Sequence, residues 1–444
     1  MTPALAGRVT ADVVIVGAGS AGCVLAERLS RDPDRQVVLL ERGPERWPGR
    51  AERDLRRLPI GDDAPYALRH RTNLHGLTAA RGNAVGGSSA VNGGYFLRWH
   101  REDFASWPQG WDLARIEAAY DELDGPTGTM SVSPVTDDEL GDAGEAFEGH
   151  WSTRTAVRPL DERWPVVGVN RVLSNRTGPL RRTAAEAYLA SALGRPNLRV
   201  MTDCTVVGLE TAGSSTVTGV RAERVSVSAG EVVLCAGTLG TAHLLLRSGL
   251  DLVEGCGHLA ASEHRGLAVY YRRRSPASGG MVLPTVLHTQ DGFEIRCYRD
   301  DFASYITNLP AIGAMVEVTA MQPSPVRLVD GGDRVDLIFD EPAPETAAAM
   351  RAHADAVVEM LNSPDFADIV VPGSVTVADV PGFSQHAWGT MPLGECTDRL
   401  GGVPGVHGLR IVDGSILPAG GRSGPHATIM MTAVCIGDEL AGVR

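Results

Sequence analysis

The chain has 444 residues, and all 41 of its basic side chains are arginine, because the sequence contains no lysine. Schiff-base chemistry on a lysine and a phosphate-loop lysine are therefore excluded. The 54 acidic residues bring the formal net charge to -13, which opposes binding to nucleic acid or to an anionic membrane surface. A small molecule is the expected partner, and at about 150 residues per domain the length predicts two or three domains.

Cysteine usage and the absence of long apolar runs indicate the compartment. Seven cysteines with no C-x-x-C pair favour thiols in a reducing interior over the disulfide framework of a secreted protein. The N-terminal stretch runs directly into an apolar strand without a signal-peptide pattern, and no apolar run reaches the roughly 18 residues that a membrane span needs. We expect a cytoplasmic protein without a transmembrane segment, peripheral to the membrane at most.

The first fifty residues predict a strand, a glycine turn, a helix and a second strand. Residues 12–16 (DVVIV) form a short β-branched run, as expected of a buried parallel strand. Residues 23–29 have the apolar spacing of a helix, and residues 37–40 form the second apolar run. This order is that of a dinucleotide-binding unit.

Each small or acidic residue of this unit has a mechanical role. Gly17 permits the tight turn, Gly19 lets the backbone approach a pyrophosphate, and Gly22 lets the helix pack on the strand. The helix begins near Ser20, where backbone N–H groups and the helix dipole attract phosphate. Glu41 follows the second strand at the spacing where an acidic side chain binds an adenosine ribose. The motif alone does not separate NAD from FAD.

A second glycine-rich stretch, residues 81–94 (RGNAVGGSSAVNGG), favours FAD. With the first motif it resembles the glucose-methanol-choline (GMC) family of FAD-dependent oxidoreductases, in which this segment lies along the pyrophosphate and the flavin ring. The resemblance continues in the family's order at residues 95–98, 103–112, 195–198, 231–237, 386–390, 413–415 and 425–430. It implies FAD contacts from Arg81, Gly86, Gly87, Ser88, Asn92 and Gly93.

The later blocks add further FAD contacts. A strand over residues 232–234 ends in a third glycine turn that opens a helix, and ligands bind at such carboxyl ends of parallel strands. The FAD contacts expected from these blocks are Ala236, Gly237, Asp413 and Gly414. Val206 is expected by its position to give backbone contacts to the adenine. Val91 occupies the region where some relatives attach FAD through a histidine, so we expect non-covalent FAD.

The pattern predicts a Rossmann-like α/β domain with a discontinuous substrate cap of antiparallel sheet and helices. Other expected elements are a hairpin over 198–225, a helix over 345–361 after Pro344, and a C-terminal helix over 427–440. The FAD domain is assigned to residues 8–125, 183–260 and 400–444, and the cap to 126–182 and 261–399. Two glycine-, serine- and proline-rich segments read as irregular: 129–170 and 254–285.

Two histidines are the candidates for the chemistry. Oxidising an alcohol through a flavin requires a base for the hydroxyl proton, and imidazole suits that role because its ordinary pKa is about 6.5. The two positions that face the flavin N5 in the GMC family match His386 and His426. We expect His386 to be the principal base, and His426 to orient the substrate oxygen or to share the proton.

A metal site is not expected. Cys256, His258 and His264 match no common zinc spacing and lack a fourth ligand. His264 corresponds only loosely to the histidine of the G-x-N-L-x-D-H stretch that relatives carry, so the role of this loop stays open.

The expected activity is FAD-dependent oxidation of a CH–OH group. Residues 92–96 and 178–189 resemble the mycofactocin-associated GMC enzymes, which implies a peptide-derived redox cofactor as substrate and a quinone or respiratory carrier as electron acceptor. Two alternatives stay open: an alcohol or sugar oxidase or dehydrogenase with an ordinary small substrate, and a non-redox lyase that retains FAD.

Overall fold

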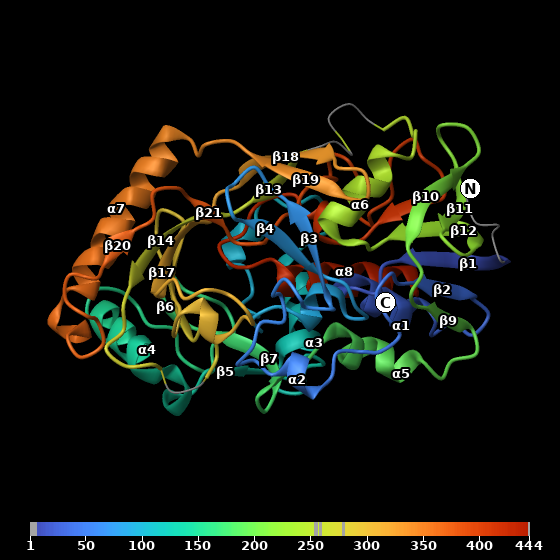
Figure 1. Cartoon of the computed structure of the whole chain (residues 1–444). Coiled ribbons are helices and arrows are strands. Elements are labelled where there is room, and N and C mark those ends of the chain that lie inside the picture. The colour runs from blue at the N-terminus through green and yellow to red at the C-terminus, as the bar shows by residue number, and fades with distance from the viewer. Residues whose placement is uncertain (1–6, 253–255, 257–259, 278–279, 443–444) are drawn as a thin grey trace.

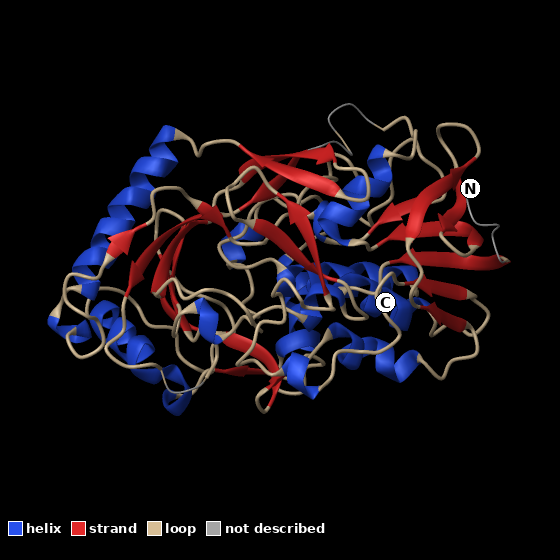
Figure 2. Ribbon diagram, viewed as in Figure 1, coloured by secondary structure: helices blue, strands red, loops and turns tan. Residues whose placement is uncertain are grey.

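Two seven-stranded sheets lie at opposite ends of the molecule (Figure 1). The structure, a computed structural model, describes residues 7–252, 256, 260–277 and 280–442. Helices and smaller sheets lie between the two large sheets, and further helices lie outside the sheet at the left of the view (Figure 2).

The first sheet has the order β10-β11-β12-β1-β2-β9, with β22 beside β12. Its strands β12, β1, β2 and β9 are parallel, and β10 and β11 form the predicted hairpin that feeds β12. Every residue of β2 is buried, which explains its unbroken apolar sequence. The bounds are β1 (Arg8–Val16), β2 (Val37–Leu40), β9 (Leu198–Met201), β10 (Val206–Thr211), β11 (Val217–Ala222), β12 (Ser226–Leu234) and β22 (Leu409–Ile411).

Three helices form a layer against this sheet. Helix α1 (Ser20–Leu29) packs against α8 (His426–Leu440), and α8 packs against α3 (Leu113–Asp124). The side chain of Asp112 accepts a hydrogen bond from the N–H of Arg115 and caps α3. Because α8 begins at His426, this layer brings a predicted catalytic residue to the first sheet.

The second sheet has the order β20-β14-β17-β16-β15-β6, with β21 beside β14, and its strands are antiparallel. They come from both chain segments that the sequence assigns to the cap. The bounds are β6 (Gly168–Arg171), β14 (Arg265–Tyr271), β15 (Thr285–His288), β16 (Phe293–Cys297), β17 (Ala314–Ala320), β20 (Thr376–Val377) and β21 (Gly382–Phe383).

The two faces of this second sheet differ in polarity. In β16, Phe293 and Ile295 belong to the apolar cluster that includes residues of α4 (Asp137–Ser152) and α7 (Pro344–Leu361). Successive side chains of a strand point to opposite faces, so Glu294 and Arg296 point toward the first sheet's half of the molecule. The sheet therefore presents charged groups to the interior of the protein.

Smaller sheets and helices complete the described chain. Three small sheets are β3 (Ala67–Arg71) with β4 (Thr78–Gly82), β5 (Val132–Pro134) with β7 (Leu173–Thr177) and β8 (Leu180–Arg181), and β13 (Ala260–Glu263) with β18 (Ser324–Asp330) and β19 (Val335–Phe339). The other helices and turns are α2 (Arg50–Arg53), α5 (Ala190–Ala192), α6 (Gly237–Leu246), η1 (Gly87–Ala90), η2 (Arg101–Phe104), η3 (Ala185–Leu189), η4 (Phe302–Ser304), η5 (Pro364–Phe366) and η6 (Gly414–Ile416).

The expectation of irregular structure over 129–170 is wrong, because this segment holds the 16-residue helix α4. Thr136 and Glu139 form a capping box at its start, and Gly141 interrupts its helical backbone with a φ of 72°. Glycines inside the helix weaken its sequence pattern. The described part of 254–285 likewise contains β13 and β14.

The cysteines also depart from expectation. Cys256 and Cys396 form a disulfide, so the prediction of thiols throughout is wrong for this pair. The remaining five cysteines are free and buried. The two bonded residues are 140 positions apart, a separation that no local cysteine motif reveals.

No helix in the described parts of the chain is both long and apolar enough to cross a membrane.

Candidate active site

The two glycine-rich segments lie against each other at the carboxyl end of β1. A Cβ on Gly87 would lie 2.6 Å from the Cα of Gly19, and Gly86 donates its N–H to the carbonyl of Ala18 at 2.7 Å. A Cβ on Gly22 would lie 1.9 Å from the carbonyl oxygen of Gly17, so the first turn of helix α1 has no room for a side chain at this position. The backbone N–H groups near Ser20, at the start of α1, lie at this junction.

Glu41 lies beside this junction, at the end of β2. Its carboxylate accepts the N–H groups of Ala18 and Gly43, each at 2.8 Å, and burial raises its pKa. A carboxylate has about four lone-pair sites, so two remain for another donor. The backbone N–H of Cys204 bonds to the Glu41 carbonyl, which brings the start of β10 at Val206 to the same edge of the sheet.

The third glycine turn joins the same edge. Ala236 caps α6, and Gly237 begins it with a φ of 74°. Asp413 accepts hydrogen bonds from the hydroxyl of Thr241 at 2.6 Å and from the N–H of Ser415 at 2.8 Å, and burial raises its pKa. The carbonyl of Gly414 accepts the N–H of Gly389, which connects this turn to the segment that carries His386.

His426 begins α8 and pairs with the second glycine-rich segment. The Oδ1 of Asn92 accepts the N–H of Gly94 at 3.0 Å, so the Asn92 amide group faces Nδ1 of His426 at 3.1 Å and donates to it. Burial, followed by the charge of Arg181, lowers the pKa of His426 to about 4. The ring is therefore neutral at pH 7, and its proton resides on Nε2, which has no hydrogen-bond partner among the described residues.

His386 reaches the same place from another part of the chain. A Cβ on Gly424 would lie 3.4 Å from Cε1 of His386 and 3.3 Å from Cδ1 of Tyr95. Gly424 precedes His426 by two residues, so the structure brings both predicted catalytic histidines together. Burial, followed by the charges of Arg296 and His264, lowers the pKa of His386 well below its ordinary value. This ring, too, is neutral at pH 7.

Other predicted contacts are placed as follows. The Oγ of Ser88 accepts the N–H of Gly82 at 3.1 Å, and Gly93 lies near the side chain of Leu58. Arg81 donates to the carbonyl of Ala80 at 2.8 Å and to Oε1 of Gln385 at 3.3 Å. Arg81 therefore lies next to the His386 segment.

The sequence did not predict a buried cluster of polar side chains around Glu294, called here the Glu294 hub. The carboxylate of Glu294 accepts hydrogen bonds from the hydroxyl of Tyr95 at 2.5 Å, from His288 at 2.8 Å and from Arg296 at 2.5 Å. Although burial raises the pKa of Glu294, Arg296 and His288 hold it below its ordinary value. The other ring nitrogen of His288 pairs with Nε2 of His100 at 2.8 Å. The alternation of β16 contained the only sequence signal for this hub, because residues 293–297 (FEIRC) switch between apolar and charged side chains.

Sequence reasoning also missed Glu263 and matched His264 only loosely. The Nδ1 atoms of His264 and His386 lie 3.0 Å apart, and Glu263 accepts the backbone N–H of His386. Ligand atoms of Glu263, His264 and His386 all lie within 4.8 Å of one another. Both oxygens of Glu263 already accept backbone N–H groups, and the two rings face each other at hydrogen-bond distance, so the three form a hydrogen-bonded unit. Of the other metal candidates, Cys256 is in the disulfide, and His258 lies outside the described residues.

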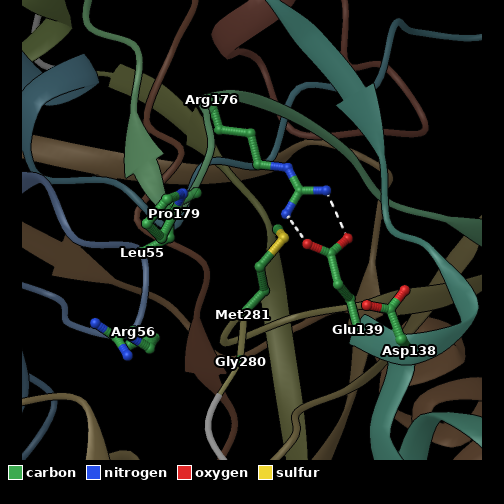
Figure 3. A pocket seen from close by; sticks show the side chains of 8 residues that line it. All are labelled: Leu55, Arg56, Asp138, Glu139, Arg176, Pro179, Gly280 and Met281. Carbon is green, nitrogen blue, oxygen red and sulfur yellow. Dashed lines mark hydrogen bonds and ion pairs between the residues drawn. The ribbon is translucent and has the colours of Figure 1, made fainter.

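A cavity of about 270 Å³ lies apart from these residues (Figure 3). An ion pair at 2.5 Å between Arg176 and Glu139 is on its wall, and Leu55 and Met281 provide apolar lining. None of the predicted site residues is among its described lining residues, which are Leu55, Arg56, Asp138, Glu139, Arg176, Pro179, Gly280 and Met281.

Comparison with known proteins identifies the family. Two family models described as GMC oxidoreductase match residues 11–258 and 339–433. An uncharacterized GMC-type oxidoreductase of Rhodococcus erythropolis is 30% identical over 97% of this chain and 99% of that protein. The chain belongs to the GMC oxidoreductase family.

Two further proteins resemble this GMC oxidoreductase. A Pseudomonas putida protein named alcohol dehydrogenase (acceptor) is 28% identical over 59% of this chain and 51% of that protein. The crystal structure of pyridoxine 4-oxidase from Mesorbium loti superimposes with a TM-score of 0.83 at 21% identity, covering 97% of this chain and 99% of that one. The structural likeness shows that the whole chain has the fold of this enzyme class.

GMC oxidoreductases bind FAD, and the residues of this site fit such a cofactor. The junction leaves no room for a side chain on Gly87, so the two backbones can approach each other as a cradle for a diphosphate requires. Buried polar atoms in these segments lack a partner within the part of the chain that the structure describes: Nε2 of His426, Nη2 of Arg81, Oγ1 of Thr390 and Oγ of Ser415. Buried polar groups are normally hydrogen-bonded, so these atoms are available to a ligand.

We expect Gly87→Ala to abolish FAD retention. The new Cβ would lie 2.6 Å from the Gly19 backbone, and it would push the two glycine segments apart. Gly178→Ala is the matched control, because Gly178 has a similar positive φ of 59° but no atom within 4 Å of the new Cβ. The ratio of FAD to protein is measured from the absorbance of the purified variants. It should fall only in the Gly87→Ala variant. Equal FAD content in both variants would refute the prediction that the contact between Gly19 and Gly87 is needed to bind FAD.

Proposed function

We propose that this GMC oxidoreductase oxidises the CH–OH group of an alcohol. Bound FAD supplies the hydride acceptor. The observation that supports the proposal is the meeting of two neutral imidazoles, His386 and His426, beside Gly424 and the second glycine-rich segment. The names of two similar proteins, alcohol dehydrogenase (acceptor) and pyridoxine 4-oxidase, agree with an alcohol substrate.

In this proposal His386 takes the hydroxyl proton of the substrate. Burial and Arg296 disfavour the charged ring, so a neutral imidazole is ready to accept a proton at pH 7. The proton leaves the hydroxyl oxygen for the ring as the hydride leaves the carbon, and the product is a carbonyl compound. Proton transfer to a positioned side chain contributes about 10²- to 10⁴-fold to the rate.

His426 holds the reacting oxygen. Because Asn92 donates to Nδ1, the neutral ring carries its proton on Nε2 and can donate a hydrogen bond from there. A donor at this position stabilises negative charge that develops on the substrate oxygen as its proton leaves. The two histidines thus have different roles, an acceptor in His386 and a donor in His426.

We expect His386→Ala to retain FAD while its turnover with a reactive alcohol falls about 10²- to 10⁴-fold. The measurement is the anaerobic reduction of the bound flavin by a panel of small alcohols, which is monitored as the bleaching of the flavin absorbance. His75→Ala, which changes an exposed histidine, should behave as the unchanged protein. An unchanged rate in His386→Ala would exclude this residue as the base. A flavin that no alcohol reduces in the unchanged protein would instead favour the non-redox lyase.

We also propose that FAD is bound without a covalent link. Val91 is buried among apolar side chains and offers no nucleophile at the position where some relatives carry a histidine. Acid precipitation should release all the flavin into the supernatant. Yellow colour that stays with the precipitated protein would contradict the proposal.

A finer proposal is that the substrate is a peptide-derived redox cofactor of the mycofactocin type and that electrons pass to a quinone or respiratory carrier. The resemblance of residues 92–96 and 178–189 to that subgroup supports this finer proposal. We then expect the reduced flavin to react slowly with oxygen and rapidly with a quinone or dye, in stopped-flow mixing of the reduced protein with each acceptor. Rapid peroxide formation would count against it.

A further inference from the structure

The backbone around His386 is clamped by the segment that carries His264. Ser262 and Trp388 exchange backbone hydrogen bonds at 2.8 and 3.0 Å, and Ser384 donates its N–H to the carbonyl of His264 at 3.0 Å. Residues 262–264 and 384–388 therefore form a short antiparallel pair, although they lie more than a hundred positions apart in the sequence. This pairing fixes the path of the chain on both sides of His386.

Glu263 strengthens the clamp from inside. Its two oxygens accept the backbone N–H of His386 at 2.8 and 2.7 Å, and one of them also accepts the N–H of His264 at 2.8 Å. The side chain is fully buried. Burying a carboxylate is unfavourable unless it is hydrogen-bonded. Glu263 makes its hydrogen bonds to the backbone of His264 and His386, which holds these two residues in place.

The side chain of His264 is held by contacts with Trp388 and His386. Its ring is fully buried, and it packs on Trp388 with ring centroids 4.5 Å apart. Its Nδ1 lies 3.0 Å from Nδ1 of His386, with the two rings nearly perpendicular at 89°. One nitrogen must donate and the other accept, because two neutral imidazoles share a single proton across such a contact.

The direction of this hydrogen bond follows from the role proposed for His386. Burial, followed by Arg296, lowers the pKa of His264 to about 3, so this ring is neutral and carries one proton. Nε2 of His264 has no hydrogen-bond partner among the described residues, so no other contact there competes with the one at Nδ1. For His386 to take the substrate proton on Nε2, its own proton must reside on Nδ1. Nδ1 of His264 is then the acceptor, and His386 donates from its own Nδ1.

We propose that His264 is a positioning residue that holds His386 in the Nδ1-protonated tautomer and so leaves Nε2 free to take the substrate proton. The inference rests on the proposed function, because it assigns a role to the partner of the proposed base. In the opposite tautomer Nε2 would carry a proton, and His386 could only donate to the substrate oxygen. The hydrogen bond that one ring nitrogen makes sets the state of the other.

Two substitutions separate the hydrogen bond from the packing. His264→Asn keeps an acceptor, since Oδ1 of asparagine occupies the place of Nδ1, whereas His264→Phe keeps an aromatic ring without an acceptor. We expect kcat for alcohol oxidation to fall roughly 10- to 100-fold in the phenylalanine variant, with KM changed less than about twofold. The asparagine variant should retain most of the activity, and His75→Phe is the control for the same change at an exposed site. Equal rates in His264→Phe and the unchanged protein would overturn the proposal.

A measurement independent of turnover reads the tautomer directly. In the FAD-bound protein with ¹⁵N-labelled histidine, the ring signals of His386, assigned by their loss in His386→Ala, should show a protonated Nδ1 and an unprotonated Nε2. A protonated Nε2 would overturn the proposal even if the phenylalanine variant failed to fold. A flavin that no alcohol reduces would refute the proposed function and leave the tautomer result standing. Loss of activity on dialysis against EDTA would show a metal between these residues and would also overturn the proposal.

Discussion

The close approach of two backbones, at Gly19 and Gly87, is the constraint on which the rest of this enzyme depends. A side chain on Gly87 would occupy the space of the Gly19 backbone, so these two segments meet only because Gly87 has no Cβ atom. That contact joins the end of β1 to the segment that leads through Asn92 to Tyr95. Asn92 pairs with His426, and Tyr95 and His386 both lie beside Gly424, so this backbone contact leads to both catalytic candidates.

The second large sheet contributes charged side chains to the site instead of an apolar surface. Glu294 and Arg296 lie on its inner face, and each is at least 96% buried. Burying a carboxylate and a guanidinium costs several kcal/mol per ion unless pairing offsets it, and here Tyr95, His288 and Arg296 surround the Glu294 carboxylate. The positive charge of Arg296 disfavours protonation of His264 and His386. The second large sheet thereby affects the protonation of the two histidines.

Neutral imidazoles with defined hydrogen-bond directions are the common feature of the site. His426 accepts from Asn92 on one nitrogen, and His386 shares a hydrogen bond with His264. Burial keeps all three rings uncharged, so each carries one proton whose location depends on its neighbour. Identical side chains can therefore serve as an acceptor and a donor toward the same substrate oxygen.

The sequence by itself determined the local units, because strand runs, glycine turns and helix ends depend on neighbours close along the chain. The strand at 37–40, the hairpin before β12, the helix after Pro344 and the family were all readable in this way. It also named His386 and His426, because each lies in a recognisable block. Only the tertiary structure decided the rest. The bond between Cys256 and Cys396 and the pairing of His264 with His386 join residues that lie far apart in the sequence. The fold likewise brings together the partners of Glu294, although the alternation in β16 already placed this residue on one face of its strand. Gly141, inside α4, weakened the local pattern of that helix. Local propensity acts over a few residues, whereas burial and hydrogen-bond partners are set by the folded chain as a whole.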